Sequence, residues 1–123
     1  MAVSIKRVYE EPDKNDGVRV LVDGIWPRGM KKEEAEVDHW MKEVAPSKEL
    51  RQWFNHDADK FQEFKEKYKE ELKQHQEKQA TLNKLKQVVR DNNKQVTLLF
   101  AAKDEKHNQA QVLKEILDHQ PGH

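Results

Sequence analysis

Apolar residues alternate with polar ones in two short stretches of the chain and form an almost continuous run in a third. Alternation around Val3, Ile5 and Val8 predicts a first strand, and residues 18–23 fit a second. Residues 96–102 are apolar nearly throughout, which is typical of a strand covered on both faces. The pattern therefore predicts three strands, with the last in the centre of the sheet.

Between the second and third strands, and again after the third, apolar residues recur at every third or fourth position, the spacing of a helix that buries one face. Four helices are expected, with inner faces formed by Leu50, Trp53 and Phe54; by Phe61, Phe64, Tyr68 and Leu72; by Leu82, Leu85, Val88 and Val89; and by Ala110, Leu113, Ile116 and Leu117. Ser47, Asp57 and Asp104 are placed to cap three of them. Residues 37–44 fit either a helical face or a strand, and we favour a short strand that ends before Pro46.

This order of elements predicts the fold class α/β. We expect residues 1–123 to form a single compact domain, with a small, mostly parallel sheet of three to four strands covered by about four helices. The strands at 18–23 and 96–102 should lie side by side or nearly so. If they are parallel, the residues that follow each of them emerge at the same edge of the sheet, where open α/β sheets bind ligands.

Composition narrows the possible functions. Hydrophobic residues make up 35% of the chain and charged residues 37%, but the apolar residues gather in periodic patches, which favours folding over disorder. Basic and acidic residues number 23 each, so the basic excess of a general nucleic-acid or membrane-surface binder is missing. We therefore expect a cytoplasmic protein with no membrane partner, for which nucleic acid is an unlikely partner.

The loop after the second strand carries the first candidate site. Arg28, held in a loop shaped by proline and glycine, is suited to bind phosphate or carboxylate through two hydrogen bonds. The alternative is a salt bridge to Asp23 or to a helix C-terminus. Asp23 is a candidate catalytic base or a positioning group for Arg28, and alternatively a turn cap. Trp26 is either a wall of a ligand site or a core residue.

A second candidate segment follows the last strand. His107 comes three residues after Asp104, in what we expect to be the first turn of the last helix, where the helix dipole favours anions and a neutral imidazole. His107 is thus a candidate proton acceptor, or alternatively a surface histidine. Lys103, Asp104 and Asn108 are candidate ligand-binding residues.

Several other chemistries have little support. Without cysteine, the chain has no thiolate nucleophile or thiolate zinc ligand, and its histidines lack the spacing of a metal site, so we expect no metal. Ser4 and Ser47 are the only serines, and neither lies in a nucleophile elbow. Four glycines in total exclude the glycine-rich dinucleotide and Walker loops.

Three motifs resemble one family. They are RVLVDGIWPRG at 19–29, APSKELRQWFNHD at 45–57 and TLLFAAKDEKHNQA at 97–110. Together they make the chain similar to the uncharacterised YeaO-like proteins of the domain of unknown function 488 group. The resemblance implies a fold, and it places Asp23 and Arg28 near His107. Gly24 stands where many relatives have Arg, and Arg19 would partly compensate by turning towards the site.

We expect a site for a small anionic ligand between the Asp23–Arg28 loop and the junction at residues 103–108. Such a domain is either an enzyme or a binding protein, and no cofactor or oligomeric state is indicated. The alternative is a protein interaction module in which these motifs are structural and the aromatic residues serve a core or an interface. A DNA-binding regulator is a weaker alternative, because the net charge is zero.

Overall fold

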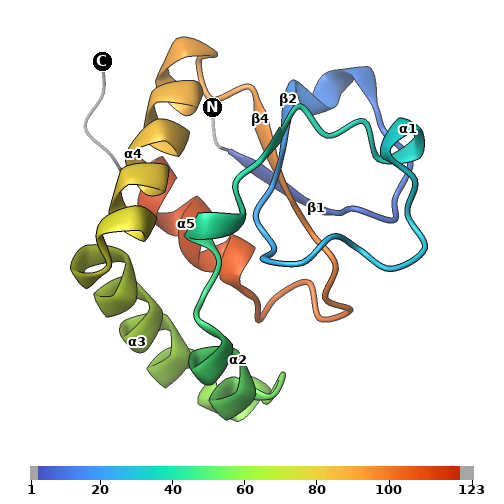
Figure 1. Cartoon of the computed structure of the whole chain (residues 1–123). Coiled ribbons are helices and arrows are strands. Elements are labelled where there is room, and N and C mark those ends of the chain that lie inside the picture. Colours follow the sequence, from blue (N-terminus) through green and yellow to red (C-terminus); the bar gives the residue numbers. More distant parts are fainter. Residues whose placement is uncertain (1–2, 120–123) are drawn as a thin grey trace.

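The computed structural model describes residues 3–119, and these form one α/β domain around a four-stranded sheet (Figure 1). Its strands are β1 (Ser4–Arg7), β2 (Val18–Leu21), β3 (His39–Trp40) and β4 (Val96–Phe100). They lie in the order β1-β4-β2-β3, and every neighbouring pair is parallel. The predicted fold class is confirmed, and β2 and β4 are adjacent at the centre of the sheet.

The register of the two central strands follows from their apolar residues. Val18 pairs with Val96 and Leu21 with Leu99, so both strands end at the same edge of the sheet. All five residues of β4 are buried, as its continuous apolar character predicts. Gly17 makes the tight turn into β2 at φ 68°, where a Cβ atom would lie 2.1 Å from the Gln95 carbonyl oxygen.

Five α-helices occur among the described residues: α1 (Lys32–Ala35), α2 (Lys48–Phe54), α3 (Phe61–Gln74), α4 (Gln76–Asp91) and α5 (Gln109–Asp118). Three short 3₁₀ turns cover Lys14–Asp16, Lys42–Val44 and Ala58–Lys60. Ser47 caps α2 as predicted, since its hydroxyl accepts the Leu50 N–H at 3.1 Å. Asn55 ends α2 in the left-handed conformation, which asparagine adopts more readily than most residues.

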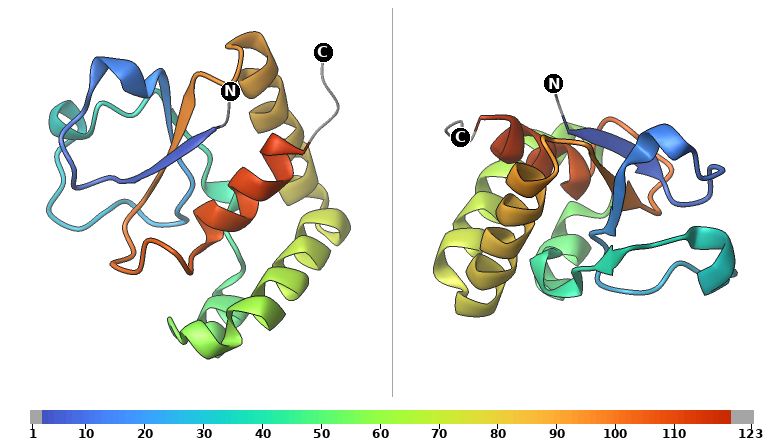
Figure 2. Two further views of the ribbon diagram at one scale, coloured as in Figure 1. Left: turned by 180° about the vertical axis from the view of Figure 1, so that it is seen from behind. Right: turned by 90° about the horizontal axis from the view of Figure 1, so that it is seen from above.

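The two faces of the sheet are covered differently. Val20, Leu98 and Phe100 point to a large core shared with α2, α3, α4 and α5, which gather on one side of the sheet (Figure 2). Leu21 and Leu99, whose positions alternate with those residues, join a smaller cluster with Val8 and Ala35 on the other face. That second face is covered by α1 and by the loop after β2.

Two boundaries differ from the predicted ones. The predicted strand at 37–44 is confirmed only for His39–Trp40, because the chain then turns into the 3₁₀ segment Lys42–Val44. The predicted cap of the last helix is wrong: α5 begins at Gln109, and Asn108 caps it by accepting the Gln111 N–H. None of the helices within residues 3–119 is both long and apolar enough to cross a membrane.

Candidate functional site

The loop after β2 and the junction after β4 meet at the carboxyl edge of the sheet. Asp23 connects them, because its Oδ2 atom accepts the Ala101 N–H at 2.9 Å and its Oδ1 atom accepts the Gln109 side-chain amide. These two segments are far apart in the sequence and become neighbours because β2 and β4 are adjacent and parallel.

A pocket of about 880 Å³ lies where these segments meet. Seven of the eight residues predicted for the site line it: Asp23, Trp26, Arg28, Lys103, Asp104, His107 and Asn108. Its size is within the range of pockets that bind small organic molecules.

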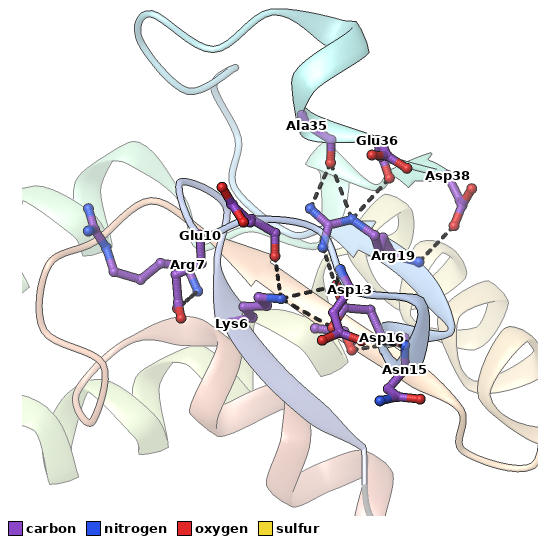
Figure 3. A network of polar contacts seen from close by, with 12 residues as sticks. Lys6, Arg7, Glu10, Asp13, Asn15, Asp16, Arg19, Ala35, Glu36 and Asp38 are labelled. Atoms are coloured by element: carbon purple, nitrogen blue, oxygen red, sulfur yellow. Dashed lines mark hydrogen bonds and ion pairs between the residues drawn. The ribbon is translucent and has the colours of Figure 1, made fainter.

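Arg19, the eighth predicted residue, does not reach the pocket, and the expectation that it turns towards the site is wrong. Figure 3 shows its guanidinium in a network of polar contacts, where it donates to the carbonyl oxygens of Ala35 and Glu36. Its Nη1 atom lies 2.5 Å from the carboxylate of Asp16, which also pairs with Lys6. Arg19 is 4% exposed, and a buried guanidinium needs this complete set of acceptors.

The carboxylate of Asp23 is partly enclosed by the two segments that it joins. Burial raises the pKa of Asp23, although the hydrogen bonds from Ala101 and Gln109 and the positive charge of Arg51 act in the opposite direction. Both carboxylate oxygens therefore have partners within the protein. This arrangement fits a positioning role for Asp23 in the pocket wall.

His107 and Asp104 form a pair among the residues that line the pocket. The Nδ1 atom of His107 lies 2.9 Å from Oδ2 of Asp104, and Oδ1 of Asp104 accepts the backbone N–H groups of Lys106 and His107. The hydrogen bond from the Lys106 N–H, followed by that of the His107 side chain, lowers the pKa of Asp104. The imidazole ring packs against Phe61 in a T-shaped arrangement at a centroid distance of 5.3 Å. Asp104 thus orients the ring of His107 and is itself ionised at neutral pH.

The predicted position of His107 inside the last helix is wrong, since His107 comes before α5. Asp104 accepts the backbone N–H groups of Lys106 and His107, which lie in the turn before the helix. The N-cap residue of α5 is Asn108. Asn108 is 2% exposed, and its amide also donates to the Asp104 carbonyl at 2.8 Å. Both ends of this side chain are therefore used to shape the junction.

Trp26 combines the two roles considered for it. Its ring packs against the smaller core cluster and also lines the pocket. The indole N–H donates to the Met30 carbonyl at 2.7 Å, and the ring meets Trp40 edge-on at a centroid distance of 5.4 Å. Trp40 in turn donates its indole N–H to the Asp23 carbonyl at 2.8 Å, so the two tryptophans stabilise the conformation of the loop after β2.

Three cations surround the pocket: Arg28 from the loop, Lys103 from the junction and Arg51 from α2. All three are exposed, and within residues 3–119 none of their side chains forms a hydrogen bond or a salt bridge. The expected alternative for Arg28, a salt bridge to Asp23, is therefore not observed. Metal ligation has no support in the described region, where no three acidic or histidine side chains are grouped to hold an ion.

Arg51, Gln109 and Tyr9 also line the pocket and were not predicted from the sequence. Arg51 lies in the second of the three motifs, at 45–57, which was the available signal for it. The contact between Gln109 and Asp23 spans 86 positions, and no local pattern predicts it. Tyr9 donates its hydroxyl to the Arg28 carbonyl at 2.9 Å and so ties the loop to the end of β1.

A family profile described as the inactive DUF488-N3 subclade matches residues 2–121. The chain belongs to this family. The uncharacterised protein YeaO of Escherichia coli (strain K12) is 38% identical over 117 residues, which cover 95% of this chain and 97% of YeaO. The YeaO-like family predicted from the three motifs is therefore confirmed.

Closer identity extends over part of the chain. Uncharacterised proteins of Mycobacterium tuberculosis (strain H37Rv) and Mycobacterium bovis are each 54% identical over 70 residues, 57% of this chain. The match spans 59% of the length of these mycobacterial relatives. No solved structure matches the chain.

Proposed function

We propose that this member of the DUF488-N3 subclade binds a small organic anion in the pocket and does not convert it chemically. One observation carries the proposal: within residues 3–119 the side chains of the three cations around the pocket form no hydrogen bond or salt bridge, whereas both carboxylates, Asp23 and Asp104, accept hydrogen bonds. The charge left to meet a ligand is therefore positive. Arg28 and Arg51 are suited to planar anions such as carboxylates, and Lys103 adds a point charge.

Binding without conversion is supported by the residues that are missing from the pocket. The chain contains no cysteine, and neither serine lines the pocket. Asp23, the candidate base, uses both oxygens to hold the pocket wall. The family description, an inactive subclade, agrees with a binding role.

A second candidate, proton transfer by His107, is favoured by the Asp104–His107 pair. A carboxylate at Nδ1 orients an imidazole so that Nε2 faces a substrate, and within residues 3–119 this Nε2 atom has no hydrogen bond. In this second function His107 is the catalytic proton acceptor. A pocket ligand that the native chain alters chemically and that His107→Gln leaves unaltered would support this second function and overturn binding without conversion. Equal conversion by both chains would exclude His107 as the proton acceptor.

The interaction-module alternative has less support. The aromatic residues considered for an interface are Trp40, Trp53, Phe54 and Phe61. Phe54 is buried and Trp53 and Phe61 pack against the large core, so that Trp40 alone of these four is exposed. Two of the exposed large apolar residues, Tyr9 and Ile25, line the pocket itself. The exposed apolar surface near this edge therefore belongs in large part to the pocket.

Titration by ¹H–¹⁵N NMR with phosphate, acetate and benzoate tests the proposed function. We expect amide signals of residues 24–28 and 101–109 to shift with at least one of these anions and to return as sodium chloride is added. Arg28→Gln, Arg51→Gln and Lys103→Gln should each weaken binding about two- to fivefold, since an exposed ion pair contributes ~0.5–1 kcal/mol. Lys84→Gln, an exposed cation on α4, is the matched control. Absence of shifts with every anion, or equal weakening by the control, would overturn the proposal.

A further inference from the structure

We infer that the ligand is an amphipathic anion, with a ring-sized apolar body on the pocket floor and a charged group at the mouth. This inference rests on the proposed function and adds the class and orientation of the ligand. It follows from how exposed and buried residues are distributed around the pocket.

The cations and the apolar residues of the pocket lie at different depths. Arg28, Arg51 and Lys103 are exposed, so their charged ends are at the mouth. Ala45, Pro46, Phe54 and Phe64 are buried lining residues and form an apolar floor supplied by α2, α3 and the segment before α2. A fully charged or fully polar ligand would leave this floor without a partner.

The carboxylate of Asp23 favours the same orientation of the ligand, with its charged group at the mouth. Asp23 is more enclosed than the three cations, and its negative charge repels a second anion placed beside it. An anionic group is attracted to the mouth and excluded from the Asp23 side, whereas an uncharged ring meets neither effect.

The volume of the pocket sets an upper limit on the size of the ligand's apolar body. Pockets of about 300–1,000 Å³ enclose most of the surface of a drug-sized molecule, and this pocket measures about 880 Å³. A phosphate or acetate ion fills only a small part of that space. A fused two-ring body with one carboxylate fits within that space, covers more of the apolar floor than either ion, and carries the charge that the mouth attracts.

Three probes separate body from charge: 2-naphthoate carries both, 2-naphthalenemethanol carries the ring without the charge, and acetate carries the charge without the ring. We expect 2-naphthoate to bind about tenfold or more tightly than either of the others, because only it uses floor and mouth together. Nuclear Overhauser effects should connect its ring protons with the methyl group of Ala45.

A variant of the wall provides a second readout. Gly24 lines the pocket at an ordinary backbone conformation, and a Cβ atom there meets only Ala45 Cβ, at 3.5 Å. Gly24→Leu should place a side chain beside the floor and weaken 2-naphthoate about tenfold while leaving acetate unchanged. Gly24→Ala is the matched control, and the far-ultraviolet circular dichroism of both variants checks the fold.

The outcomes distinguish a failure of this inference from a failure of the proposed function. If acetate and 2-naphthoate bind equally, or if Gly24→Leu weakens both alike, the inference fails while anion binding stands. If 2-naphthalenemethanol binds as tightly as 2-naphthoate, the charge plays no part, and both the inference and the proposed function fail. Tight binding of 2-naphthoate alone, with contacts to Ala45, supports both.

Discussion

Asp23 joins the ends of the two central strands by accepting the Ala101 N–H at 2.9 Å, 78 positions away in the sequence. The same carboxylate accepts the Gln109 amide, so one side chain fixes the loop after β2, the end of β4 and the start of α5. The pocket exists because these three segments are held together.

Replacing Asp23 should therefore lower the stability of the domain. Asp23→Ala leaves the Ala101 N–H and the Gln109 amide without an acceptor, and we expect a loss of about 1–3 kcal/mol in the free energy of unfolding. Asp23→Asn should lose less, because the Gln109 amide can rotate and present its oxygen to the new donor. Urea denaturation measures both, and equal losses would contradict this positioning role.

Arg19 and Asp16 form a second link, away from the pocket. Arg19→Lys should lower the free energy of unfolding by about 2–4 kcal/mol, because an ammonium group cannot reach Asp16 and the carbonyl oxygens of Ala35 and Glu36 together. Urea denaturation gives the loss, and 2-naphthoate titration of the folded variant should give an unchanged affinity. A marked fall in affinity would instead connect Arg19 with the site.

Arg28 and Arg19 show which features of the site can be predicted from the sequence and which cannot. Both lie in the same motif, yet one is an exposed residue of the pocket and the other a buried structural cation. Apolar periodicity predicted the central strands, and their parallel arrangement brought the two candidate segments together. The direction of a polar side chain on a strand depends on acceptors from other elements, here the carbonyl of Ala35, which no local pattern specifies.

The start of the last helix illustrates a second limit. The sequence predicts the cap at Asp104, yet Asn108 is of a residue type that caps helices equally well. Asp104 bonds to the N–H groups of Lys106 and His107 and to the His107 ring, so the turn before α5 uses it fully. Competition between local hydrogen bonds therefore moved the helix start by about one turn.

The acid sensitivity of the fold should depend on Asp16 and Asp23 in opposite ways. Burial alone would raise the pKa of Asp16, but hydrogen bonds from the Asp13 N–H, Lys6 and Arg19 lower it below its ordinary value of 3.8. Its stabilising contribution is thus present above that value and is lost as the pH falls through the lowered pKa. Asp23, whose pKa is raised chiefly by burial, stabilises the fold when protonated and loses that contribution as the pH rises through its raised pKa.

Urea denaturation between about pH 3 and pH 7 tests this difference. Asp16→Asn should flatten the fall in stability below about pH 4, whereas Asp23→Asn should steepen the fall, because it removes the group that gains from protonation. Asp13→Asn, a change beside Asp16 that leaves the salt bridges intact, serves as the control. A steeper fall with Asp16→Asn would show that its pKa is not lowered in the folded state.

Arg7 should control the shape of the pocket without touching a ligand. Its guanidinium donates to the carbonyl oxygens of Ala101 and Ala102 at 3.1 and 3.0 Å and lies 5.1 Å from the ring centre of Tyr9. Since Tyr9 in turn holds the Arg28 carbonyl, Arg7 links both halves of the pocket. We expect Arg7→Gln to cost about 1–2 kcal/mol in stability and to weaken 2-naphthoate severalfold.

Hydrogen exchange separates this positioning role from a general loss of stability. In Arg7→Gln, the amides of residues 101–103 should exchange faster by a larger factor than those of the α4 core, because the opening is local to the end of β4. Tyr9→Phe should produce a smaller effect in the loop at Arg28 only. Lys14→Gln, an exposed cation of the first 3₁₀ turn, should change neither exchange nor binding. Uniformly faster exchange throughout Arg7→Gln would mean that Arg7 stabilises the whole domain and that the pocket has no special dependence on it.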